Sequence, residues 1–257
     1  MRDFSGKVGV VTGAGRGIGH AVARAMVQRG MVVVLSDVEA AQPAHAAALL
    51  GGESEAIGVV CDVTEPGQVG ALAELTMERF GRVDLLCNNA GVVAGGRTWE
   101  IPLEDWNRVL SVNLWGAIHC VHAFVPLMVG NESGGHVVNV ASMAAVTPVP
   151  GIAPYNVSKY GLLALSETLH ADLQRAGSSV GVTVVMPGRV ATSLGSPSGE
   201  PDPEPGDEVA AAHAGVLTTD AVADQIVHAV EGDQLYLFTH GDHLELVEAR
   251  FSRILGR

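Results

Sequence analysis

The sequence contains few cysteines, few aromatic residues and few charged ones. Its three cysteines, Cys61, Cys87 and Cys120, are an odd number and form no CxxC pair, which argues against a disulfide framework and fits a reducing compartment. Aromatic residues make up 4% of the chain and charged residues 17%. Ala, Val, Leu and Gly supply most of the apolar share, which favours helices packed on buried parallel strands over an aromatic-rich sandwich.

Basic residues are scarce as well, and the formal net charge is −13. Binding to nucleic acid takes clustered Lys and Arg, and so does docking on an anionic membrane, so the composition argues against both partners. No apolar run approaches the roughly 20 residues of a membrane helix. The N-terminus has no signal-peptide apolar region. We therefore expect a cytoplasmic protein.

What the chain does contain is a regular alternation of short apolar runs and helix-like segments. The pattern predicts strands at 8–11, 32–35, 59–61, 83–87, 137–141, 180–186 and 235–238. It predicts helices at 18–29, 69–80, 103–128, 154–175 and 218–230, with an Ala-rich helical stretch before the third strand. Such alternation indicates an α/β fold, a Rossmann-like doubly wound parallel sheet of about seven strands with helices on both faces. Because no linker divides the chain, we expect a single domain over residues 1–257.

One segment, Ser196 to Glu208, is rich in Pro, Gly and acidic residues and lies between the sixth strand and the last helix. Ligands of such sheets bind beyond the carboxyl ends of the strands. The segment therefore predicts a mobile substrate-binding flap around residues 193–216, with a solvated surface loop as the alternative.

A glycine-rich turn, Thr12 to Gly19, follows the first strand and opens the first helix. Glycine there permits a tight turn and a close approach of the backbone to a pyrophosphate, and the helix N-terminus attracts the phosphates. Asp37 ends the second strand, where a carboxylate can bond ribose hydroxyls and repel a 2′-phosphate. Arg16 works in the opposite direction, since a guanidinium can pair with that phosphate. We predict NAD as the cofactor, with NADP still possible.

Taken in order, several motifs resemble those of the short-chain dehydrogenase/reductase family in its form of roughly 250 residues and one domain. They are TGxxxGxG from Thr12, Asn88-Asn89-Ala90-Gly91, Asn113, Ser142, Tyr155-xxx-Lys159 and Pro187-Gly188. The resemblance covers nearly the whole chain. It implies an NAD(P)-dependent oxidoreductase acting on CH–OH groups, with a small alcohol or ketone as its substrate, usually assembled as a homotetramer.

The resemblance also implies where the cofactor binds. The pyrophosphate would contact the glycine-rich turn, the adenine an acidic residue after the third strand, and the nicotinamide the segment after the sixth strand, while the motif after the fourth strand borders the cofactor. The residues concerned are Gly13, Arg16, Gly17, Ile18, Gly19, Asp37, Asp62, Val63, Asn89, Ala90, Gly91, Tyr155, Lys159, Pro187, Gly188, Val190 and Thr192.

The expected catalytic residues are Asn113, Ser142, Tyr155 and Lys159. Tyr155 and Lys159 are four residues apart and share one face of a helix. A nearby ammonium lowers the pKa of a phenol, which lets Tyr155 exchange a proton with an alcohol. Ser142 would bond the substrate oxygen. By the resemblance, Asn113 would hold a water that links Lys159 to solvent.

Each of these residues has a simpler interpretation when it is taken alone. A tyrosine and a lysine at this spacing are more often a half-buried side chain and a solvated one. His119 with His122, and His240 with His243, have spacings that suggest metal ligation, but helix-surface or interface histidines are the better interpretation. We expect no metal, because a phenol and a serine polarise the substrate oxygen without one.

The expected substrate pocket draws on residues 92–97, 143–150 and 192–216, which are mostly aliphatic. This lining favours a hydrophobic or alicyclic alcohol or ketone. Arg97 and Arg189 are exceptions, each more consistent with a solvated side chain than with a carboxylate clamp. Two alternatives stay open: an NADPH-dependent ketone or 3-oxoacyl reductase, and a nucleotide-sensing protein without turnover on the same fold.

Overall fold

The computed structural model describes the chain except residues 2, 53, 193, 195–214 and 242–243. Its centre is a seven-stranded sheet in the order β3-β2-β1-β4-β5-β6-β7, and every neighbouring pair runs parallel. The strands are β1 (Val8–Thr12), β2 (Val32–Asp37), β3 (Ala56–Val60), β4 (Leu85–Asn88), β5 (Gly135–Val140), β6 (Val180–Met186) and β7 (Tyr236–Phe238). The predicted fold class and the number of strands are confirmed.

The order of the strands places the site. The chain winds outward from β1 to β3 on one side and returns through β4 to β7 on the other, so the direction of winding reverses between β1 and β4. In parallel sheets the crevice at such a reversal, beyond the carboxyl ends of the strands, is where ligands bind. Thr12, Asp37 and Asn88 end three of these strands at this edge.

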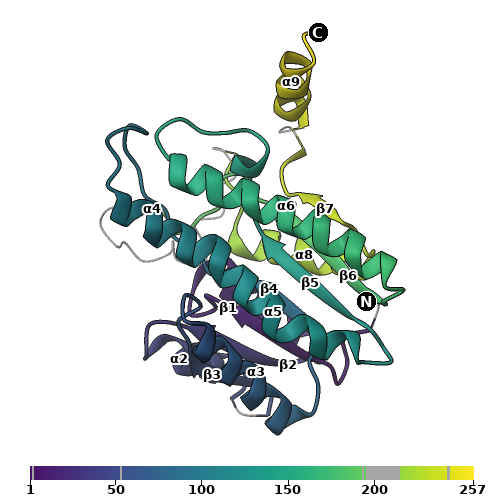
Figure 1. Cartoon of the computed structure of the whole chain (residues 1–257). Helices are drawn as coiled ribbons and strands as arrows, with labels where there is room; N and C mark the ends of the chain where they lie inside the picture. The colour runs from purple at the N-terminus through teal and green to yellow at the C-terminus, as the bar shows by residue number, and fades with distance from the viewer. Residues whose placement is uncertain (2, 53, 193, 195–214, 242–243) are drawn as a thin grey trace.

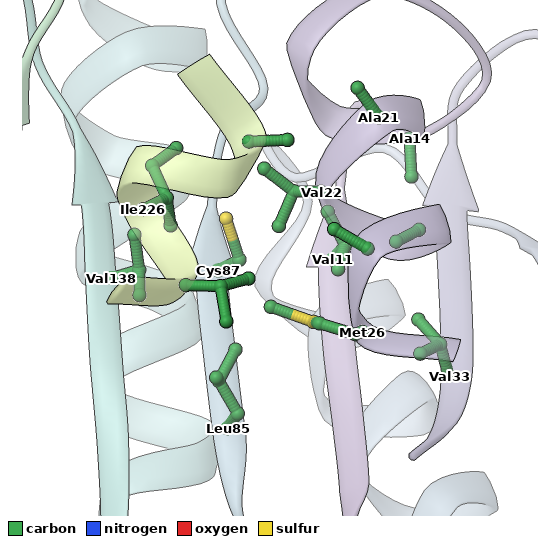
Figure 2. Packing of buried hydrophobic residues seen from close by; sticks show 14 of the residues in the cluster. Val11, Ala14, Ala21, Val22, Met26, Val33, Leu85, Cys87, Val138 and Ile226 are labelled. Carbon is green, nitrogen blue, oxygen red and sulfur yellow. The ribbon is translucent and has the colours of Figure 1, made fainter. Parts of the chain in front are cut away.

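One face of the sheet is covered by α1 (Gly17–Val27), α2 (Gln42–Leu49) and α8 (Thr219–Glu231). Figure 2 shows Val22 and Met26 of α1 and Ile226 of α8 meeting the side chains of the central strands. Cys87 and Val138 fill the space between these two helices and the sheet. The buried layer is aliphatic, as the composition predicts, and it fixes α1 against the end of β1.

The other face carries α3 (Pro66–Phe80), α4 (Leu103–Leu110), α5 (Gly116–Val129) and α6 (Ala153–Arg175). In Figure 1, α4 and α5 follow one another along one axis, with α6 on one side of it and α3 on the other. The segment Leu103–Val129 is long and apolar enough to span a membrane by length and composition alone. The expectation that no such stretch exists was therefore too strict. Core helices pass the same test, and this segment places Phe124 and Met128 in the core against the sheet.

Two features of the chain differ from the predicted elements. The helix expected at 103–128 is interrupted by a π-helical turn, η1 (Ser111–Trp115), between α4 and α5. A further helix, α9 (Leu244–Ile254), was not predicted and projects from the body of the molecule (Figure 1). It has no buried residue in the described part of the chain, and Arg250 lies over the ring of Tyr160 on α6.

Candidate active site

The glycine-rich turn brings β1 into α1 with backbone conformations that favour glycine. Gly13 and Gly17 have φ angles of +60° and +61°, in the left-handed region that other residues rarely adopt. A Cβ on Gly19 would lie 2.4 Å from both the Asn89 amide nitrogen and the Gly13 carbonyl oxygen. These three positions therefore need glycine for the shape of the turn, whatever it binds.

The turn presents a helix end that suits an anion. Among the described residues, no side chain caps the N-terminus of α1, and its first turn carries no acidic residue. The backbone N–H groups around Gly17, Ile18 and Gly19 thus face the crevice with the positive end of the helix dipole. A dinucleotide pyrophosphate fits this donor set.

Thr12 ties the turn to the Asn88–Gly91 motif, a role that the sequence analysis missed. Its hydroxyl oxygen accepts hydrogen bonds from the backbone N–H groups of Asn89 and Ala90, each 3.1 Å long. The Asn89 amide donates to the carbonyl oxygens of Thr12 and Gly13 at 3.0 and 2.9 Å. The TG dipeptide was visible in the sequence, but the partner of Thr12 lies 77 residues away.

Asp37 is held against the glycine-rich turn. One carboxylate oxygen accepts from the Gly15 N–H at 3.0 Å, and the other accepts from the Glu39 N–H at 3.2 Å. Arg16 follows Gly15 in the turn, and its guanidinium pairs with Glu39 at 3.5 Å, with both side chains more than half exposed. The carboxylate that favours NAD thus contacts the turn, and the guanidinium that favours NADP has an acidic partner at the surface.

Asp62 and Val63 follow β3 at the same edge. The Asp62 carboxylate accepts from the Thr64 N–H at 2.9 Å and from its hydroxyl at 2.8 Å, which fixes the turn. Val63 is buried beside Gly116, and its carbonyl oxygen lies 2.9 Å from Nδ1 of His119. His119 therefore has a backbone partner, as a structural histidine would.

Tyr155 and Lys159 lie in α6 as predicted, but their electrostatics differ from the expectation. Lys159 is 3% exposed and donates to the Val140 carbonyl oxygen at 2.8 Å, with Nζ 5.5 Å from the centre of the Tyr155 ring. Burial lowers the pKa of Lys159 to about 8. Burial raises the pKa of Tyr155, and hydrogen bonding with Ser142 offsets part of this rise. In the protein alone, burial therefore outweighs the ammonium that was expected to lower the pKa of the phenol.

Ser142 stands at the end of β5, between Tyr155 and the next turn. Its hydroxyl oxygen caps the short 3-10 helix η2 (Met143–Ala145) by accepting from the Ala144 N–H at 3.1 Å. The Met143 N–H in turn donates to the Pro187 carbonyl oxygen at 2.9 Å. The serine is thus fixed by local structure and linked to the segment after β6.

Asn113 is buried in the π-helical turn, where its side chain holds two neighbouring segments. Its amide oxygen accepts from the Val92 N–H at 2.8 Å, and its nitrogen donates to the Val92 carbonyl oxygen and to the Ser158 hydroxyl. A Cβ on Gly91 would lie 3.6 Å from the Asn113 amide oxygen and 3.7 Å from Lys159 Nζ. Gly91 therefore leaves room between these two groups. π-helical turns are frequent at functional sites.

The segment after β6 carries Pro187 and Gly188, which are expected to bind the cofactor, and Val190 and Thr192, which are expected to hold the nicotinamide. Leu217 fixes its backbone, because its N–H donates to the Arg189 carbonyl oxygen and its own carbonyl accepts from the Ala191 N–H. Gly188 donates its N–H to Nδ1 of His240 at 3.2 Å. Most of the flap predicted around 193–216 lies outside the described residues.

The other candidate ligands and nucleophiles do not gather into a site. No group of three or more His, Cys, Asp or Glu side chains suited to a metal occurs in the described part of the chain. His243 is outside it. The three cysteines are buried, and burial raises the pKa of the Cys87 thiol to about 12, so that thiol stays protonated and unreactive at neutral pH.

Comparison with known proteins agrees with this arrangement. Residues 7–202 match the family described as short chain dehydrogenase. A solved structure of a short chain dehydrogenase/reductase from Burkholderia phymatum, in complex with NAD, is 37% identical with a TM-score of 0.89, and the match covers 100% of this chain and 97% of that one.

Two curated relatives are similar over almost as much of the chain. The CLA biosynthesis dehydrogenase/reductase of Lactiplantibacillus plantarum is 34% identical over 99% of this chain and 95% of its own. The 1-deoxy-11-beta-hydroxypentalenate dehydrogenase of Streptomyces avermitilis is 36% identical over 91% and 84%. The chain thus belongs to the short-chain dehydrogenase/reductase family, and it is an NAD(P)-dependent oxidoreductase that acts on alcohol and ketone groups.

Proposed function

We propose that the chain transfers a hydride between NAD(H) and a small hydrophobic or alicyclic secondary alcohol or ketone, with Tyr155 as the general acid/base. The observation that carries this proposal is the grouping of Tyr155, Ser142 and the buried Lys159 at the carboxyl end of β5. The uncapped start of α1 opens at the same edge of the sheet.

In the oxidation direction, Ser142 donates a hydrogen bond to the substrate oxygen, and Tyr155 takes the hydroxyl proton as the C–H bond breaks. The nicotinamide, when bound, accepts the hydride and returns it in the reverse direction. The positive charge of Lys159 and the one that oxidised nicotinamide would add both favour the phenolate of Tyr155, against the burial that raises its pKa. Because the Lys159 ammonium donates to the Val140 carbonyl oxygen, its positive charge is held in one position.

We propose that Asn113 acts by holding the loop at Val92 and the helix at Ser158 in register, which keeps the space beside Gly91 open. A water in this space has both the Asn113 amide oxygen and Lys159 Nζ as neighbours. Such a water would pass a proton from Lys159 toward solvent after Tyr155 has released its own.

The preference for NAD is supported by the carboxylates around the glycine-rich turn. Asp37 contacts Gly15, where the adenosine ribose of a dinucleotide bound to this turn would lie. Glu39 pairs with the Arg16 guanidinium, the group that would otherwise pair with a 2′-phosphate. A phosphate near both carboxylates is repelled, and the exposed ion pair with Glu39 offsets part of the attraction that Arg16 would exert on it. NADP therefore binds more weakly than NAD.

The proposal of an apolar substrate is supported by two loops near Tyr155. The loop at 92–97 lies beside the loop at 146–152, joined by a Gly96 N–H to Gly151 carbonyl bond of 2.8 Å. Val146 is buried there and Ile152 half-buried. Arg97 pairs with Glu100 at 3.2 Å and is largely exposed, so it is not a carboxylate clamp. These contacts favour a neutral, apolar substrate.

We further propose that the chain is one domain, that residues 193–216 cover the substrate, and that the protein is a cytoplasmic homotetramer. The oligomer is supported by apolar surface on the helices of one face. Trp115 is 54% exposed and Val129 47%. A groove between α3 and α5 is lined by Ala73, Met77, His119, His122, Ala123 and Leu127, among others.

The test is a panel of secondary alcohols and ketones with NAD(H) and NADP(H), followed by nicotinamide absorbance. We expect the highest kcat/KM with NAD⁺ and an apolar alicyclic or aliphatic alcohol. A large rate with NADPH and a 3-oxoacyl thioester, and none with neutral alcohols, would favour the reductase alternative. A Tyr155→Phe variant that kept every activity of the wild type would favour a nucleotide-sensing protein.

A further inference from the structure

His240 has no role in the predicted chemistry, and within the described residues it belongs to no group suited to a metal. It lies two residues beyond the end of β7, and it is buried, with 8% of its surface exposed. The sequence places it in a His-Gly-Asp-His cluster, which suggested metal ligation. In the structure its ring faces the backbone of the segment after β6.

The parallel pairing of β6 and β7 brings His240 to its partner. Val184 pairs with Tyr236, and Met186 pairs with Phe238, the last residues of the two strands. Beyond this point His240 lies beside Gly188, and the Gly188 N–H donates to Nδ1 of His240 at 3.2 Å. A backbone N–H can only donate, so Nδ1 is the acceptor and carries no proton. The Thr239 hydroxyl also lies 2.7 Å from Nδ1.

The bond acts on the segment expected to contact the nicotinamide. Residues 187–191 are fixed from the other sides by the Met143 N–H on the Pro187 carbonyl and by the backbone of Leu217. His240 adds a side-chain contact at the glycine of this segment. Glycine has little conformational restraint of its own, so a bond to its N–H limits the orientations that this turn adopts.

We propose that His240 is a positioning residue for the nicotinamide half of the cofactor, acting through the Gly188 N–H. The inference rests on the proposed function and on the family resemblance, which implies that Val190 and Thr192, in the segment from Pro187 to Thr192, hold the nicotinamide. In this proposal His240 acts only through the Gly188 N–H and contacts neither the adenosine half nor the reacting atoms. Its loss should therefore weaken binding of the whole dinucleotide and spare a ligand that lacks nicotinamide.

The experiment compares the affinities of NADH and of ADP-ribose, measured by titration calorimetry on the full chain. His240→Leu removes the acceptor and keeps an apolar side chain, and we expect it to weaken NADH binding roughly tenfold, the equivalent of about one hydrogen bond. ADP-ribose affinity should stay within about twofold of wild type, because the adenosine and pyrophosphate contacts remain.

His240→Asn tests the bond itself, since its side-chain oxygen occupies nearly the place of Nδ1 and accepts from Gly188. We expect it to restore NADH affinity to within about threefold of wild type. His228→Leu, on the exposed face of α8, is the matched control and should change neither affinity.

Equal weakening of NADH and ADP-ribose by His240→Leu, or no weakening of either, would overturn the inference, and so would an Asn variant as weak as the Leu variant. These outcomes leave the proposed function standing. Wild-type protein that bound ADP-ribose but not NADH would overturn both. Thermal unfolding of each variant, run beside the titrations, separates a local loss from a damaged fold.

Discussion

The burial of Lys159 costs stability, and the cost can be measured by replacing it with Met. Burial lowers the pKa of Lys159 from 10.5 to about 8. The corresponding free energy of holding the ammonium in the folded protein is about 3 kcal/mol. Lys159→Met removes this cost but leaves the Val140 carbonyl oxygen without its donor. The lost hydrogen bond lowers the free energy of unfolding by about 1–2 kcal/mol. We expect a net gain in the free energy of unfolding of about 1–2 kcal/mol at pH 7, together with loss of activity.

The sign of the pH dependence follows from proton binding. Between the folded pKa of about 8 and the unfolded value of 10.5, the unfolded chain binds more protons than the folded one, so the stability of the wild type rises with pH. The Met variant has no such titration. Its advantage should therefore be full below about pH 8 and should disappear as the pH rises toward the unfolded value.

The assay is urea unfolding of cofactor-free protein at about pH 7 and about pH 9.5, with wild type and variant compared at each. Lys7, the other lysine of the chain, is half-buried near the N-terminus, and Lys7→Met is the matched control for the substitution itself. A Lys159→Met variant that is less stable than wild type at pH 7, or whose advantage is the same at both pH values, would refute the reasoning.

Three further predictions concern the cofactor site and the proton donor. Tyr155→Phe should lower kcat for alcohol oxidation by a factor of about 100 or more while NADH affinity stays within about threefold; an equal loss in NADH affinity would contradict the assignment. Asp37→Asn combined with Glu39→Gln should raise the ratio of NADPH to NADH affinity by roughly tenfold or more. The double substitution removes two negative charges near the 2′-phosphate and removes the ion-pair partner of Arg16. An unchanged ratio in a binding titration would show that these carboxylates do not set the cofactor preference. Gly19→Ala should lower both the melting temperature and NADH affinity, because its Cβ would lie 2.4 Å from the Gly13 carbonyl oxygen. Gly67→Ala, in α3 with nothing within 4 Å of the added carbon, is the control and should stabilise the protein by up to about 1 kcal/mol.

The interruption of the long helix shows one limit of the sequence. Residues 103–128 have the apolar spacing of one continuous helix, and the pattern contains no Gly or Pro before Gly116 that marks a break. Within the π-helical turn at Ser111–Trp115, Asn113 bonds to Val92 and Ser158. Both partners lie on other elements, so periodicity along one helix carried no signal of the turn.

The pKa values of Tyr155 and Lys159 show another limit of prediction from the sequence. Spacing correctly put Tyr155 and Lys159 on one face of α6, and it suggested that the ammonium lowers the pKa of the phenol. Whether an ammonium or the loss of solvent dominates depends on depth and on the direction of the side chain. The structure turns Lys159 toward the Val140 carbonyl oxygen in the core, and burial then controls the pKa of both groups.

The sequence by itself determined the parts of this protein that depend on local pattern: the alternation of strands and helices, the need for glycine between β1 and α1, and the order of the family motifs. The tertiary structure decided which distant residues meet. Examples are the hydrogen bond between Thr12 and Asn89, the ion pair between Glu39 and Arg16, and the hydrogen bond between Gly188 and His240. These contacts form because parallel strands end at a common edge. The physical reason is that backbone propensity and apolar spacing act over a few residues, whereas hydrogen-bond partners and solvent exposure are set by packing between segments far apart in the chain.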